Sequence, residues 1–107
     1  MKCFAWVLLL YAQFSFAGVL NTEVGRIKSI YTYDDAEGGI VYIQITMPID
    51  VCPSGAYLNR EAVGFKELYS IAVAAMMANK DVLFQLYNDR INGSRCEVDA
   101  IRVYAAN

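Results

Sequence analysis

The sequence of 107 residues contains no histidine. Histidine is the commonest general base in enzymes and the usual partner of serine and cysteine nucleophiles, so its absence excludes Ser-His-Asp and Cys-His arrangements and histidine metal sites. The chain also lacks a glycine-rich phosphate loop of the P-loop or dinucleotide type. An enzyme would be left with carboxylate chemistry, for which the sequence offers Asp50, Glu67, Asp89, Glu97 and Asp99. We therefore expect a non-catalytic protein without a cofactor or a metal site.

Basic residues are few, since 9 lysines and arginines face 11 acidic residues and give a net charge of −2. A protein that binds nucleic acid needs a basic face to displace counterions from the phosphates. The charge balance therefore argues against a nucleic-acid partner.

Residues 1–17, MKCFAWVLLLYAQFSFA, have the pattern of a secretory signal peptide. Lys2 is followed by an apolar run without further charge, and the small residues Ser15 and Ala17 stand at the positions that a signal peptidase reads. The alternative, a membrane anchor, would need roughly 20 apolar residues, and the run from residue 3 to 11 is much shorter. We expect cleavage between Ala17 and Gly18, a secreted or periplasmic protein, and no membrane insertion.

Two cysteines remain after this cleavage, Cys52 and Cys96. An even number of cysteines in an exported chain predicts a disulfide, and two cysteines allow one intrachain pairing. For a loop of this length the chain-entropy treatment gives a stabilisation of about 4 kcal/mol. The alternative, a redox-active or metal-binding pair, is disfavoured because the chain has no CxxC spacing and no histidine.

One helix is predicted over residues 61–79, where apolar residues recur at spacings of three and four. Its predicted core face consists of Phe65, Leu68, Tyr69, Ala72, Ala75 and Met76. The opposite side begins polar and then turns apolar through Val73, Ala74 and Met77, which predicts an interface with another copy of the chain. The alternative is that the sheet simply covers more of the helix. Asn59 is the expected N-cap, and Asn79 the expected left-handed cap at the other end.

Five strands are predicted around this helix, at residues 24–33, 40–47, 56–58, 82–88 and 96–104. The alternation of apolar residues breaks near Ser29 and again between Ala100 and Ile101, which predicts bulges in the first and last strands. The order of three strands, one helix and two strands suits a mainly β domain over residues 18–107. We expect a five-stranded OB-fold-like barrel with the helix between strands three and four. The alternative is a flat α+β sandwich.

Aromatic and acidic side chains gather at the first predicted hairpin: Tyr31, Tyr33, Asp34, Asp35 and, across the strand pair, Tyr42. Aromatic faces stack on apolar sugar patches and carboxylates bind ring hydroxyls, so these residues are the candidate glycan-binding site. The alternative is a tyrosine-rich strand end beside a solvated turn. Residues 87–89, Tyr-Asn-Asp, form a weaker second candidate.

The stretch Phe65-Lys66-Glu67-Leu68-Tyr69, the alanine-rich run after it, the turn Asn79-Lys80-Asp81 and the strand Val82-Leu83-Phe84 carry a resemblance. They resemble the helix and following strand in the B subunits of the AB5 toxins subtilase cytotoxin and typhoid toxin, and in small secreted bacterial homologues.

The resemblance implies an OB-fold barrel that assembles as a homopentameric ring, binds sialylated or other glycans of a host cell or surface, and has a catalytic A subunit as a candidate partner. No sugar-contacting residue of that family can be matched to a position here. The alternative function is a periplasmic monomeric or dimeric protein-interaction module, such as an inhibitor or accessory factor.

Overall fold

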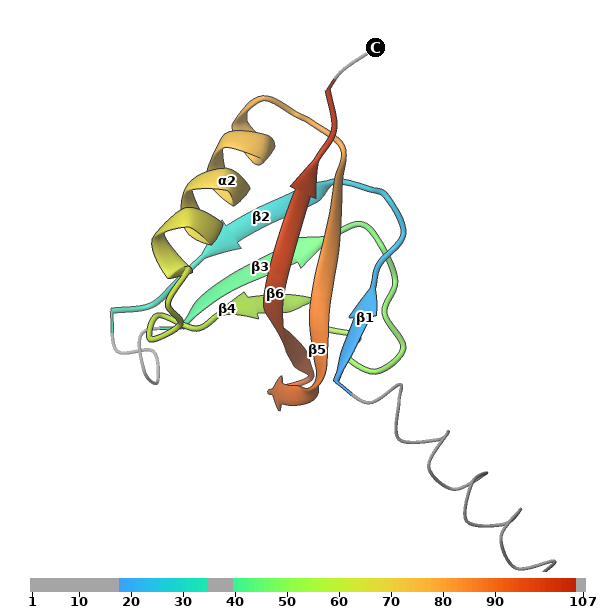
Figure 1. Cartoon of the computed structure of the whole chain (residues 1–107), viewed down its shortest axis with the longest axis vertical. Coiled ribbons are helices and arrows are strands. Elements are labelled where there is room, and N and C mark those ends of the chain that lie inside the picture. The colour runs from blue at the N-terminus through green and yellow to red at the C-terminus, as the bar shows by residue number, and fades with distance from the viewer. Residues whose placement is uncertain (1–17, 35–39, 106–107) are drawn as a thin grey trace, which may run out of the picture.

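The computed structural model describes residues 18–34 and 40–105, and these form six strands and one helix (Figure 1). The elements are β1 (Val19–Asn21), β2 (Ile27–Tyr31), β3 (Val41–Ile45), β4 (Ala56–Leu58), α2 (Phe65–Met77), β5 (Val82–Asn92) and β6 (Arg95–Val103). The predicted signal peptide, residues 1–17, and Asp35 of the predicted glycan site lie outside the described residues.

The described strands form one mixed sheet in the order β1-β5-β6-β4-β3-β2. The β4–β6 pair is parallel and the other neighbours are antiparallel. The prediction of a mainly β fold with one helix is confirmed, and so are all five predicted strands. The prediction missed β1, which pairs through Val19–Asn21 with residues 85–87 of β5.

A pair of backbone hydrogen bonds joins the segment just before β2, at one end of this sheet order, to β5. The N–H of Gly25 donates to the carbonyl of Val82 at 2.9 Å, and the N–H of Val82 donates to the carbonyl of Gly25 at 2.8 Å. Beside them, Arg26 Nε lies 2.9 Å from Asp81 Oδ1. The chain just before β2 is therefore joined to the start of β5.

Register shifts bend the sheet at three places. The shift between Ile27 and Ser29 in β2 confirms the bulge predicted near Ser29. In the β5–β6 pair, the shift predicted between Ala100 and Ile101 falls slightly earlier, at Asp99, because Ala100 still pairs with Gln85. A larger bulge follows, where residues 87–90 of β5 lie opposite a single residue of β6.

The core lies between the sheet and α2. Its largest fully buried side chains include Ile43 of β3, Leu58 of β4, and Val82, Phe84 and Leu86 of β5. Removing a side chain of this size from water stabilises the fold by about 1.5–3 kcal/mol. The helix contributes Ala72 and Ala75, which are buried as predicted.

The remainder of the predicted core face of α2 is only partly right. Leu68, Met76 and Phe65 pack against the core at its edge. Tyr69 is 42% exposed, so its assignment to the core was wrong. It lies at the border of the apolar stripe, where its ring stacks on Phe65 at a centroid distance of 6.0 Å instead of entering the core.

The ends of α2 differ in how well the sequence predicted them. The N-cap position is Gly64, without a side-chain cap, so Asn59 does not cap the helix. Asn59 lies more than a turn ahead of it, and its Oδ1 accepts the N–H of Glu61 at 3.0 Å. At the other end, Asn79 adopts the predicted left-handed conformation with φ 56°.

Within residues 18–34 and 40–105, no helix has the length and apolarity to span a membrane.

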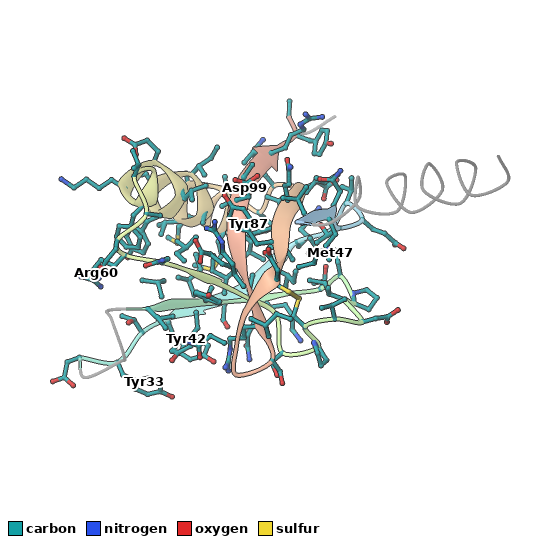
Figure 2. The ribbon with its side chains drawn as sticks, turned by 60° about the horizontal axis from the view of Figure 1, so that its bottom comes forward. Tyr33, Tyr42, Met47, Arg60, Tyr87 and Asp99 are labelled. Atoms are coloured by element: carbon teal, nitrogen blue, oxygen red, sulfur yellow. A yellow bond between two sulfur atoms is a disulfide. The ribbon has the colours of Figure 1, made fainter. Side chains whose placement is uncertain are left out.

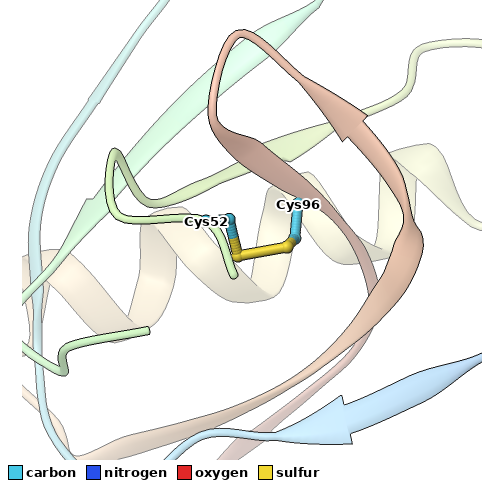
Figure 3. Close-up of a disulfide and its surroundings, with 2 residues drawn as sticks. All are labelled: Cys52 and Cys96. Atoms are coloured by element: carbon cyan, nitrogen blue, oxygen red, sulfur yellow. A yellow bond between two sulfur atoms is a disulfide. The ribbon is translucent and has the colours of Figure 1, made fainter. Parts of the chain in front are cut away.

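The predicted disulfide between Cys52 and Cys96 is confirmed, with a Cα–Cα distance of 5.6 Å (Figure 3). Both cysteines are fully buried. The bridge ties the loop after β3 to the start of β6, and Ser54 N–H adds a hydrogen bond to the Ser94 carbonyl at 3.0 Å. Such a bridge is typical of small proteins that fold outside the reducing cytoplasm.

Candidate functional site

Three tyrosines meet on the outer face of β2 and β3, and we call Tyr31, Tyr33 and Tyr42 the tyrosine cluster. Tyr31 and Tyr42 are cross-strand partners, and their rings stack at a centroid distance of 5.2 Å. Tyr33 meets them edge-on at 6.0 and 6.3 Å and is 62% exposed. Tyr33 and Tyr42 lie on the side of the sheet away from α2 (Figure 2). The structure therefore brings together the three aromatic residues of the predicted glycan site.

The acidic residues of the predicted glycan site, unlike its three tyrosines, are not seen to join the cluster. Asp34 follows Tyr33 in an exposed turn, and its carboxylate accepts no hydrogen bond from the hydroxyls of Tyr31, Tyr33 and Tyr42. Asp35 lies outside the described residues. The polar partner of the rings comes instead from another part of the chain.

Arg95, at the start of β6, lies over the Tyr42 ring of the tyrosine cluster and was missed by the sequence analysis. Its Cζ is 4.6 Å from the centroid of the Tyr42 ring, and its Nη2 donates to the Tyr31 hydroxyl at 3.1 Å. Its Nη1 reaches the Gly93 carbonyl at 3.3 Å. The buried Nε has no hydrogen-bond partner among the described residues. A buried donor without a partner is costly, so this N–H is an unsatisfied group beside the tyrosine cluster.

A hollow of about 260 Å³ opens beside Arg95 on the same face. It is lined by Lys28, Gln44, Ile45, Met47, Pro53, Ser54, Gly55 and Arg95. The lining holds two cations and no carboxylate, which favours an anionic group.

The wall formed by residues 53–55 is fixed from two sides. The neighbouring Cys52 is held by the disulfide. Gly55 has φ +111°, and a Cβ there would lie 2.7 Å from the Ile43 carbonyl oxygen, so only glycine fits. The hollow is therefore pre-formed on the side that faces Arg95.

A second group of polar residues surrounds the large bulge of β5, and we call it the bulge cluster: Tyr57, Tyr87, Arg90, Glu97 and Asp99. Glu97 is only 5% exposed. Its Oε1 lies 3.5 Å from the Tyr57 hydroxyl, and its Oε2 lies 3.5 Å from Arg90 Nη1. The Arg90 guanidinium covers the Tyr87 ring at 4.0 Å, and the Tyr87 hydroxyl donates to Asp99 Oδ1 at 2.8 Å (Figure 2).

Both tyrosine hydroxyls of the bulge cluster are held in their protonated form. Burial raises the pKa of Tyr57 above its ordinary value of 10.0, and the charge of Glu97 raises it further. The hydrogen bond to Asp99 raises the pKa of Tyr87. Of the weaker candidate at residues 87–89, Tyr87 belongs to this cluster, whereas the Asn88 side chain accepts the N–H of Gly18 at 3.1 Å. The groups of this cluster thus bind mainly one another.

No protein-family model, no curated protein and no solved structure matches the chain. Its function has to be argued from the chemistry of these residues.

Proposed function

We propose that the chain is a secreted, non-catalytic glycan-binding protein whose ligand contacts the tyrosine cluster and Arg95. The observation that carries this proposal is the combination, on one face, of a tyrosine cluster whose Tyr33 ring is exposed, the Arg95 guanidinium against it and a cation-lined hollow. The exposed ring of Tyr33 offers a face for the apolar patch of a sugar, and the tyrosine hydroxyls can exchange hydrogen bonds with ring hydroxyls.

The charges around the hollow favour a glycan with an acidic group. Lys28 and Arg95 both line it, and their positive charges attract a carboxylate. A sialylated glycan would place its ring against the tyrosine cluster and its carboxylate in the hollow.

The fold supports the same assignment. We infer an OB-fold-like barrel from β2–β6, since α2 lies between the third and fourth of these strands and the Gly25–Val82 hydrogen bonds join the first to the fourth. Proteins of this fold bind oligosaccharides on the face of their second and third strands, between the loop after the first strand and the loop before the last. Tyr33 and Arg95 stand at these two loops, and Tyr42 lies on the second strand.

The test is isothermal titration of the oxidised protein with 3′-sialyllactose and with lactose. Tyr33→Ala and Arg95→Gln should each weaken sialyllactose binding about tenfold, which corresponds to the loss of about 1.4 kcal/mol. Tyr104→Ala is the matched control, because Tyr104 follows the far end of β6, about 27 Å along the strand from Arg95. If the protein bound lactose as tightly as 3′-sialyllactose, the proposal of an acidic ligand would be wrong. If Tyr33→Ala bound sialyllactose as tightly as the unmodified protein, the proposed location of the site would be wrong. Failure to bind any acidic or neutral sugar on a glycan array would overturn the function.

We also propose that the protein assembles as a homopentameric ring, as the resemblance to toxin B subunits implies. The surface of α2 supports self-association, because Tyr69 and Met77 are 42% and 77% exposed and lie one turn before and after Val73 on the same side of the helix. Of the predicted interface residues, Val73 is half-buried, while Ala74 and Met77 are exposed. The ring would offer its helix-lined pore to a catalytic A subunit.

Native mass spectrometry tests the ring. A mass five times that of the subunit supports it, and Val73→Glu combined with Met77→Glu should then give monomers. Val24→Glu combined with Val51→Glu is the matched control, because both residues are exposed and lie outside α2, and it should keep the ring. A monomer for the unmodified protein would overturn the ring. In that case the exposed side chains of α2 favour the second candidate, a periplasmic module that docks on another protein.

A further inference from the structure

A second hollow, of about 360 Å³, lies over β1, β5 and β6 and shares no residue with the hollow beside Arg95. These three strands lie side by side (Figure 1). Its lining consists of Asn21, Leu83, Gln85, Ala100, Ile101 and Arg102. Its volume falls within the range of about 300–1,000 Å³ that is usual for small-molecule sites.

The strand register explains why a hollow forms here. Asn21, Gln85 and Ala100 are cross-strand neighbours in one row. Leu83 and Arg102 are partners in the next row of the β5–β6 pair. Because partners point to the same face, the small side chain of Ala100 stands between larger neighbours and leaves a depression. Its floor is apolar, with Leu83 half-buried beside Ala100.

The rim of this hollow carries three side chains with unused hydrogen-bonding capacity. The carboxamides of Asn21 and Gln85 and the guanidinium of Arg102 make no hydrogen bond or ion pair with other residues in the ranges 18–34 and 40–105. Each carboxamide offers one acceptor and two donor hydrogens, and the guanidinium offers donors only. A few convergent polar groups around an apolar floor are typical of a ligand site.

We propose that this second hollow binds a neutral sugar ring. Sugar hydroxyls both donate and accept hydrogen bonds and so match the two carboxamides, while the apolar face of the ring can lie on Leu83 and Ala100. An acidic ligand is disfavoured because Arg102 is the one cation in the lining and Asp99 adjoins Ala100 in the chain. An added peptide strand is disfavoured too, because β5 and β6 already pair on both sides.

This inference goes beyond the proposed function, because it gives the chain two sugar sites of different chemistry. The tyrosine cluster would bind an acidic terminal sugar, and the second hollow a neutral one. One protein could then contact two branches of a glycan or two neighbouring glycans, which raises its apparent affinity without any new contact.

Chemical-shift titration of the ¹⁵N-labelled, oxidised protein tests the second hollow. The probes are the methyl glycosides of galactose, glucose, mannose and N-acetylglucosamine. At least one should shift the signals of Asn21, Gln85 and Ala100 with a Kd of about 1 mM, as expected for a ligand of this size. Ala100→Leu fills the hollow and should weaken this binding more than tenfold. Ala105→Leu is the matched control, since Ala105 is exposed beyond the end of β6 and should leave the Kd unchanged.

The same titration separates this inference from the proposed function. Tyr33→Ala should lose sialyllactose binding and keep the monosaccharide shifts, which would support two independent sites. The inference is overturned if none of the four glycosides shifts the three signals, if Ala100→Leu binds as well as the unmodified protein, or if Tyr33→Ala abolishes both responses. The amide spectrum of each variant shows directly whether it is folded.

Discussion

Replacing Gly25 by alanine should destabilise the protein, because the added methyl group would collide with a buried side chain. Gly25 exchanges two backbone hydrogen bonds with Val82, at 2.9 and 2.8 Å, so its backbone position is fixed. A Cβ at this position would overlap Met47 Sδ and lie 2.6 Å from both Met47 Cγ and Thr46 Oγ1. Met47 is only 6% exposed and has little room to move aside.

The expected size of the effect follows from this crowding. Forcing one extra carbon into a packed region costs about 1–3 kcal/mol. A domain of this size has a total stability of about 5–15 kcal/mol, and its melting temperature should fall by about 4–8 °C for each kcal/mol lost. Urea and thermal unfolding followed by circular dichroism would measure both quantities. Gly64→Ala is the matched control, because a Cβ there meets no atom within 4 Å, and its effect should stay within about 0.5 kcal/mol.

A double-mutant cycle with Met47→Ala isolates the collision. Met47→Ala alone should cost about 2–5 kcal/mol, because it leaves a cavity in the core. In the double variant, the new methyl group enters the space that Met47 vacates, so the total cost should fall short of the sum by at least about 1 kcal/mol. Additive costs, or a Gly25→Ala variant as stable as Gly64→Ala, would refute the reasoning.

Three further predictions concern the disulfide, the tyrosine hydroxyls and the end of α2. Reducing the Cys52–Cys96 bridge should lower the free energy of unfolding by about 4 kcal/mol, measured by urea unfolding with and without a dithiol, and an unchanged urea midpoint would contradict this. The folded state raises the pKa of Tyr57, so its stabilising contribution is complete below pH 10 and is lost as the pH rises through the folded pKa. Urea midpoints should therefore fall above pH 10 less steeply in Tyr57→Phe than in the unmodified protein. Asn79→Ala should cost about 1–2 kcal/mol because φ is +56° there, whereas Asn79→Gly should not, and equal stabilities of the two would count against a strained cap.

The parts of the fold that were predictable from the sequence depend on local patterns. Alternation in β3 and β5 and the three- and four-residue spacing in α2 identify these elements, because each pattern is complete within one segment. β1 escaped prediction since Val19–Asn21 is too short to show a period, and its partner strand begins at Val82. Strand pairing between segments so far apart leaves no local signal.

The candidate site likewise has one part that was predictable from a local pattern and one part that was not. Tyr31 and Tyr42 were predictable as neighbours because they flank one hairpin. Arg95 reaches them only because β6 lies parallel to β4, which itself pairs with β3. Tyr69 was misassigned to the core because the helical pattern alone does not show how wide a stripe the sheet covers.

The position of β6 in the sheet governs when the chain can fold. β6 follows the other five described strands in the sequence but lies between β5 and β4, so the ladder across the sheet remains broken until β6 has been made. Cys52 likewise has no partner until Cys96, at the start of β6, has been made. Pairings between residues so far apart in the sequence form slowly, typically in milliseconds to seconds. The reason is that closing the long loop costs conformational entropy before the stabilising contacts have formed. During that time the apolar faces of β3 and β5 are open to water, and exposed apolar surface of this kind favours aggregation until β6 and the disulfide complete the sheet.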